Sequence, residues 1–142
     1  MWGIIIALIS GALMSIQGVF NTEVTKQTSL WLTTGFAHLT ALLVCIVAWF
    51  FTDRENVTSL LQVQPKYMLL SGVIGAFITF TVIKGMDSLG PAKAVMIIVV
   101  SQIVVAYLIE VLGMFGVEKT GFEWKSLIGA ALAVAGIIIF KW

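Results

Sequence analysis

The chain has 142 residues, of which 60% are hydrophobic and only 11% are charged, and its mean hydropathy is +1.08. A water-soluble domain carries about a quarter of charged residues, so this chain has too few polar side chains to cover a soluble globule. Most of its surface is therefore expected to face the lipid bilayer. The net charge of +1 and the lack of a basic stripe argue against nucleic acid as a partner.

Five stretches are long and apolar enough to cross a bilayer, which takes about 20 predominantly apolar residues. In chain order they are residues 2–20, 30–51, 67–83, 92–115 and 124–140. We therefore predict an all-α integral membrane protein with a single transmembrane domain over residues 1–142. Indole rings prefer the headgroup level, and all five tryptophans lie near the predicted helix ends: Trp2, Trp31, Trp49, Trp124 and Trp142.

The first predicted helix carries Ser10, Gln17 and Asn21, which are seven and four residues apart and so share one helical face. Polar groups within a bilayer are costly unless they find hydrogen-bonding partners. The two amides either bond to a neighbouring helix or contact a substrate, and both alternatives remain open. We take all three residues as candidates for substrate binding.

The second predicted helix carries His38 near its centre, with Thr34, Ala41 and Cys45 on the same face. Histidine changes its charge near neutral pH, so His38 is a candidate for substrate contact or proton transfer. The alternative is a packing residue held by a hydrogen bond. Because Cys45 is the single cysteine, neither an intramolecular disulfide nor a multi-cysteine metal site can form.

Small residues that allow close helix approach recur in three of the predicted helices. They predict packing surfaces within a helix bundle, and the fifth helix, which is almost purely apolar, suits a scaffold or a dimer contact. The positions are Gly3, Ala7, Gly11 and Ser15; Ser71, Gly75 and Thr79; and Gly129, Ala133 and Gly136.

The fourth predicted helix places Ser101 and Gln102 near mid-membrane and Glu110 two turns later, as the only carboxylate inside a predicted span. If the helix continues to Glu118, Glu110 lies about 12 Å deeper than that residue. Burial there favours the protonated carboxyl unless a cation pairs with it, which suits exchange of a proton for a cationic substrate. We predict Gln102 and Glu110 as substrate-binding residues and Glu110 as the proton-coupling residue. The alternative is that Glu110 lies close to the membrane surface or pairs with a lysine.

Lysine and arginine are divided equally between the two predicted membrane faces, four against four. Orientation normally follows an excess of these residues on the cytoplasmic side, so the tie predicts dual topology and an antiparallel homodimer; the alternative is a preference that the charges do not reveal. In such a dimer Glu110 of one copy lies at about the depth of Gln17 and Asn21 of its partner. The face of the N-terminus has Arg54, Lys66, Lys119 and Lys125, and the other has Lys26, Lys84, Lys93 and Lys141.

Enzymatic chemistry finds no support, because the sequence has no metal-ligand cluster, nucleophile–base pair or phosphate-binding glycine loop. We expect no catalytic residue, no metal site and no cofactor.

A set of short motifs, taken in order and spacing, resembles the YdcZ-type branch of the drug/metabolite transporter superfamily over essentially the full chain. The resemblance implies a bacterial inner-membrane protein whose five helices equal half of a ten-helix transporter. The family pattern has aspartate in place of Glu110 and glycine in place of Ser101. The motifs are Ser10-Gly11-Ala12, Gln17-x-x-x-Asn21, Gly72-x-x-Gly75-Ala76, Leu89-Gly90-Pro91-Ala92, Ser101-Gln102, Glu110-x-x-Gly113, Gly129-Ala130 and Ala135-Gly136.

Together these features predict a secondary transporter, with proton-coupled export of a small organic metabolite or cation by alternating access in a dual-topology dimer. The alternative is a membrane partner that scaffolds or regulates another protein, or one half of a heteromeric transporter.

Overall fold

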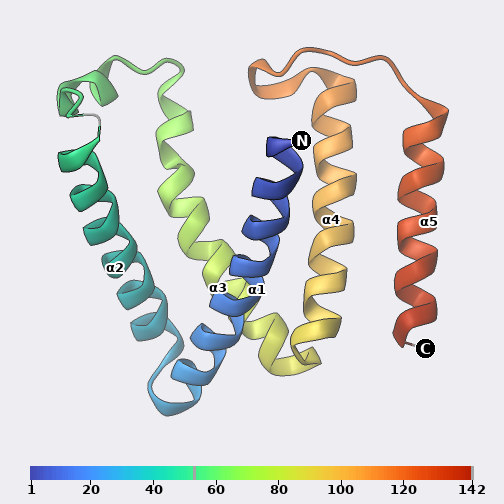
Figure 1. Cartoon of the computed structure of the whole chain (residues 1–142), viewed down its shortest axis with the longest axis horizontal. Helices are drawn as coiled ribbons and strands as arrows, with labels where there is room; N and C mark the ends of the chain where they lie inside the picture. The colour runs from blue at the N-terminus through green and yellow to red at the C-terminus, as the bar shows by residue number, and fades with distance from the viewer. Residues whose placement is uncertain (53, 142) are drawn as a thin grey trace. The chain divides into compact units, whose positions relative to one another are not determined.

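A computed structural model describes residues 1–52 and 54–141, and all regular elements in this part of the chain are helical (Figure 1). The prediction of an all-α fold is confirmed. The residues group into two compact units, Met1–Ser88 and the part from Leu89 onward, and the prediction of a single transmembrane domain stays a prediction. The elements are α1 (Trp2–Gln27), α2 (Leu30–Phe51), the 3₁₀ helices η1 (Val57–Gln62) and η2 (Lys66–Leu70), α3 (Ser71–Leu89), α4 (Pro91–Leu112), the 3₁₀ helix η3 (Met114–Gly116) and α5 (Trp124–Lys141).

Four helical stretches of the described chain are long and apolar enough to cross a membrane: Trp2–Gln27, Leu30–Phe51, Lys66–Leu89 and Pro91–Leu112. The segment Trp124–Phe140 of α5 is apolar but shorter, so a fifth crossing stays a prediction. Large apolar side chains point outward along these helices, for example Ile4, Val44 and Leu132, each 68% exposed. An apolar surface this extensive is stable only when it is covered by lipid or by another protein.

The first helix is longer than predicted, because α1 continues through the expected connection to Gln27 instead of ending near residue 20. The hydroxyls of Thr22 and Thr28 donate to the carbonyls of Gly18 and Val24, each at 2.8 Å, so these polar side chains are satisfied within the helix. Glu23 and Lys26, three residues apart, form an ion pair on the helix surface. The polar residues after Phe20 therefore continue the helix and do not end it.

The third helix is also displaced from its predicted range of 67–83. The 3₁₀ helix η2 precedes it, and α3 runs from Ser71 to Leu89. The expected connection over residues 84–91 is thereby reduced to Gly90, whose φ of +79° lies in the region that favours glycine. Pro91 then begins α4 at the first helical position, where its missing N–H costs no hydrogen bond.

The fourth helix ends at Leu112 and not at the predicted residue 115. Gly113 adopts a left-handed conformation with φ +65°, and its N–H donates to the carbonyl of Glu110 at 3.3 Å. Such a cap is a common way for a helix to end at glycine. The prediction that the helix could continue from Glu110 to Glu118 is therefore wrong.

Helices α1 and α2 of the first unit are joined by the short turn at Thr28 and Ser29, from which they spread apart (Figure 1). Ser29 caps α2 by accepting a hydrogen bond from the N–H of Leu32 at 3.3 Å. The hydroxyls of Thr28 and Thr33 lie 3.1 Å apart and link the two helices at the turn.

Helix α3 packs against both of its partners in this unit. A Cβ placed on Gly18 of α1 would lie 2.5 Å from Cε of Met86, so glycine leaves room for the end of the Met86 side chain of α3. The rings of Trp31 on α2 and Phe80 on α3 are 4.7 Å apart between centroids. Ile83 and Met86 of α3 are the large apolar side chains that are buried in the described part of this unit.

Candidate functional site

A groove of about 670 Å³ lies between α1 and α2 and contains three of the residues predicted to bind substrate. Ser10, Gln17 and Asn21 of α1 all line it, which confirms that they share one face of their helix. Thr33 and Thr40 of α2 complete its polar surface. The short turn between the helices makes these two threonines neighbours of the α1 face.

The rest of the groove is apolar, and none of the described residues that line it is charged. Apolar walls with a few polar groups are typical of binding sites for small organic molecules. The apolar lining residues are Ile6, Ile9, Leu13, Met14, Ile16, Phe20 and Val24 of α1 with Phe36 and Ala37 of α2.

The polar groups of the groove differ in whether they already have hydrogen-bonding partners. Thr40 donates to the carbonyls of Phe36 and Ala37, each at 3.0 Å, and Thr33 shares its hydrogen bond with Thr28. Within the described part of the chain, no hydrogen bond engages the side chains of Ser10, Gln17 or Asn21. Their donors and acceptors are therefore available to a ligand.

His38 lies on α2 but faces α3 and is not among the residues that line the groove. Its Nδ1 is 2.9 Å from the carbonyl oxygen of Thr34, and its Nε2 is 3.5 Å from the position of a Cβ on Gly75. This surrounding favours the packing alternative, in which a hydrogen bond holds the ring between two helices. The role of His38 in substrate binding stays a prediction.

Gln102 lies on α4, in the second unit, where it lines a surface hollow of about 460 Å³ with Ser101, Val105, Ala106 and Ile109. Glu110 is not among the lining residues. The structure therefore divides the predicted binding residues into the α1–α2 groove, the α2–α3 contact and the surface of α4.

Glu110 lies in the last turn of α4, and its exposed side chain is close to the end of the helix. Its carbonyl oxygen accepts from the N–H of Gly113 and, at 3.0 Å, from the N–H of Thr120, so the segment after α4 folds back over this end. The depth of about 12 Å below Glu118 assumed a helix that continues to that residue, and Gly113 ends the helix before it. The depth of Glu110 in the membrane stays a prediction. A helix C-terminus carries partial negative charge, which does not stabilise a carboxylate there.

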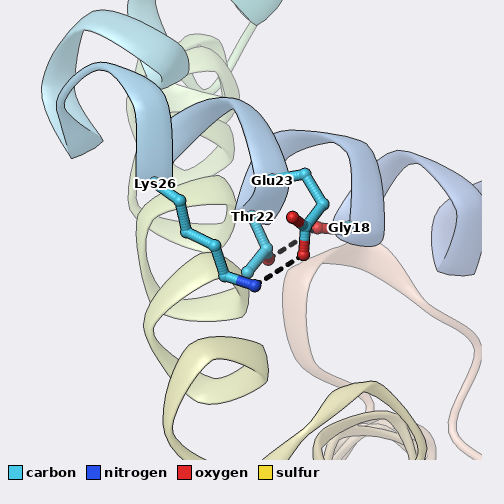
Figure 2. A network of polar contacts seen from close by, with 4 residues as sticks. All are labelled: Gly18, Thr22, Glu23 and Lys26. Atoms are coloured by element: carbon cyan, nitrogen blue, oxygen red, sulfur yellow. Dashed lines mark hydrogen bonds and ion pairs between the residues drawn. The ribbon is translucent and has the colours of Figure 1, made fainter.

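Glu110 is also not the only carboxylate within a helix that can cross a membrane. Glu23 and Asp87 lie inside the ranges of α1 and α3, near the C-terminal end of each helix. Glu23 pairs with Lys26 at 2.6 Å, beside the hydrogen bond from Thr22 to Gly18 (Figure 2). These charges were missed as span residues because both helices were predicted to end before them.

Two threonines that line the groove were not predicted, although their spacing in the sequence indicates that they share a helical face. Thr33 and Thr40 are seven residues apart, as Ser10 and Gln17 are on α1, and so they lie on one face of α2. A connection of two residues forces that face towards α1. Among the described residues, no group of three His, Cys, Asp or Glu side chains could hold a metal ion.

Comparison with known proteins gives one match. No curated protein and no solved structure matches the chain. The model of the family described as "Putative inner membrane exporter, YdcZ" matches residues 2–139, which confirms the resemblance seen in the motifs. With nearly the whole chain matched and four helices able to cross a bilayer, this multi-pass protein of the inner membrane belongs to the YdcZ family.

Proposed function

We propose that the chain is a secondary transporter that exports a small organic metabolite or cation. The observation that supports this most directly is the groove between α1 and α2. It is large enough for a small molecule, its walls are apolar, and the side chains of Gln17 and Asn21 lie in it without a hydrogen-bonding partner among the described residues.

The working unit that we propose is an antiparallel pair of copies with ten crossings. Helix α5 has 18 residues, which span about 27 Å at 1.5 Å per residue, close to the hydrocarbon thickness of about 30 Å. A fifth crossing places the termini on opposite faces, and the even division of lysine and arginine then gives neither orientation an advantage. Two inverted copies resemble the inverted repeats from which many transporters are built.

We assign proton coupling to Glu110. Glu110 is the one carboxylate of α4, and a carboxylate can exchange a proton for a cationic or donor-rich substrate. If proton and substrate each weaken the binding of the other, each lowers the affinity for the other by the same factor. This reciprocal effect couples the proton gradient to the substrate gradient.

Reconstitution of the purified protein in liposomes tests the exporter function. With a panel of metabolites and organic cations, at least one compound should be transported, and Gln17→Ala and Asn21→Ala should each reduce its apparent affinity. Loss of one neutral hydrogen bond, worth about 1 kcal/mol, corresponds to about a fivefold reduction. Gln62→Ala at the exposed end of η1 is the matched control and should leave transport unchanged.

The same assay distinguishes the rival function. Transport that appears only after a second membrane protein is added would identify the chain as half of a heteromer. If neither preparation transports any compound of the panel, the exporter proposal fails in favour of a scaffolding or regulatory partner.

A further inference from the structure

We propose that the groove between α1 and α2 binds an uncharged, largely apolar molecule that carries a hydrogen-bonding head group, and that the amides of Gln17 and Asn21 hold this head group. The inference rests on the proposed export function and deepens it, because it names the class of molecule that the groove accepts. Of the two proposed substrate classes, it favours neutral metabolites over organic cations.

The absence of charge around the groove selects against ions. None of the described residues that line it is acidic or basic, although the chain places charged residues nearby, such as Glu23 and Lys26 on the last turns of α1. Moving an ion from water into an apolar site is costly unless an opposite charge meets it there. A neutral molecule enters without that cost.

The free amides define the polar part of the ligand. Gln17 and Asn21 each offer a carbonyl acceptor and an N–H₂ donor, and no partner within the described chain uses them. They are four residues apart, so their Cα atoms are separated by about 6 Å along the helix axis. A single amide, hydroxyl or carbonyl head group fits between two such side chains.

The arrangement along the groove also gives the ligand an orientation. Counted from the turn at Thr28 and Ser29, Gln17 lies opposite Thr40, so both helices contribute at the level of the amides. Farther from the turn, the wall of the groove consists of α1 alone. This part runs from Ile6 to Met14, about 12 Å along the helix axis, and Ser10 is its one polar residue. The head group is thus held near the amides, while the apolar part extends along α1 towards its N-terminus.

A neighbouring helix is a poorer occupant of this groove than a small molecule. Helix α1 has a separate face of small residues on which helices can pack, and α3 uses it where Met86 meets Gly18. At 3.6 residues per turn, Gly11 and Gly18 lie about a third of a turn away from Gln17. The groove face carries bulky apolar side chains, which hold a second helix at a distance.

The test uses one apolar chain with different head groups. The protein in phosphatidylcholine nanodiscs is cross-linked with a diazirine analogue of decanamide, and the modified residues are mapped by mass spectrometry. Unlabelled decanamide, decanoate, decyltrimethylammonium and decane then compete for the site. We expect cross-links on the groove faces of α1 and α2. Decanamide should displace the probe at about a tenfold lower concentration than either charged competitor, since the charged head groups find no counter-charge.

Substitution of the amides separates head-group recognition from simple partition into an apolar groove. Gln17→Leu and Asn21→Leu keep the bulk and remove the hydrogen bond, so each should weaken competition by decanamide about fivefold and leave decane unchanged. Gln62→Leu on η1 is the matched control. Unchanged competition in both groove variants would overturn the inference, as would stronger competition by decyltrimethylammonium or cross-links only outside the groove faces of α1 and α2.

Binding in this assay requires neither a gradient nor transport, so its outcome is separate from that of the exporter proposal. Selective binding of decanamide without export of any compound would contradict only the exporter function. Export of an organic cation that does not displace the probe would contradict only the inference about the groove.

Discussion

The contact between α1 and α3 can be tested at Gly18, where one added methyl group should weaken the fold. In Gly18→Ala the new Cβ would lie 2.5 Å from Cε and 2.8 Å from Sδ of Met86. Contact between such atoms is favourable at about 3.5–4.0 Å, so the methionine must withdraw by about 1 Å. Both atoms are the end of a flexible side chain that can turn aside, so we expect the low end of the cost of overpacking, about 1 kcal/mol. Against this cost, alanine gains about 0.5–1 kcal/mol of helix stability over glycine.

Gly11→Ala on the same helix is the matched control, because nothing lies within 4 Å of a Cβ at that position. The gain in helix stability from glycine to alanine is the same for both substitutions, so it cancels when their free energies of unfolding are compared. The free energy of unfolding is measured by titrating the protein from mild detergent into dodecyl sulfate and following circular dichroism. It should be lower for Gly18→Ala than for Gly11→Ala by about 1 kcal/mol, the low end of overpacking.

A double-mutant cycle identifies the partner of the new methyl group. In a Met86→Ala background the two atoms that clash are absent, so Gly18→Ala should cost no more than Gly11→Ala does there. Equal stability of the two alanine variants in the wild-type background would refute the contact between the Met86 side chain and Gly18. Failure of Met86→Ala to remove the difference would place the clash on another side chain.

Three further outcomes follow from the proposals about coupling and assembly. Glu110→Gln should abolish the pH dependence of the initial transport rate in liposomes. The control Glu118→Gln, which lies beyond the end of α4, should retain it. If Glu110→Gln and the wild type have the same pH profile, the Glu110 carboxylate has a structural role only. Cysteine labelling of both termini in intact cells should find each terminus on both membrane faces, and two lysines added to the loop 52–66 should bring that loop to the cytoplasm; one fixed orientation in the wild type would exclude dual topology. Gly129→Leu should shift the dimer towards monomer in detergent cross-linking if α5 forms the interface, since nothing in the described chain lies within 4 Å of a Cβ there; an unchanged dimer would move the interface to α1 or α3.

Periodicity in the sequence was sufficient to predict which residues share a helical face. Ser10, Gln17 and Asn21 line one groove because their spacing follows the helix repeat, which does not depend on tertiary context. The packing surface predicted for Gly3, Ala7, Gly11 and Ser15 stays a prediction, because nothing lies within 4 Å of a Cβ at Gly3 or Gly11, and the contact with α3 occurs instead at Gly18. The partner on α3, Met86, could not be predicted because helix pairing depends on how the connections place the helices.

Helix ends were predicted less well, because hydropathy measures the solvent of a segment and not its hydrogen bonding. Thr22 and Thr28 satisfy their hydroxyls on the preceding turn, so α1 continues after it becomes polar. Conversely, α4 ends while the sequence is still apolar, since Gly113 adopts a left-handed conformation. This second error bears on function, because it places Glu110 in the last turn of its helix instead of in a helix that continues to Glu118.

The uncharged groove and the exposed position of Glu110 together constrain how protons and substrate can be coupled. A proton and a substrate compete directly only if both occupy the same carboxylate, and none of the described groove residues titrates near neutral pH. Binding of decanamide to the groove should therefore be independent of pH, whereas direct competition would make it weaken as protons bind. If transport nevertheless depends on pH through Glu110, the proton must shift the equilibrium between the inward-facing and outward-facing states. It can do so only if Glu110 binds the proton with different affinity in the two states. Binding and transport measured over the same pH range thus distinguish competition from conformational coupling, and parallel pH profiles for the two would show that the uncharged groove is not where the substrate binds.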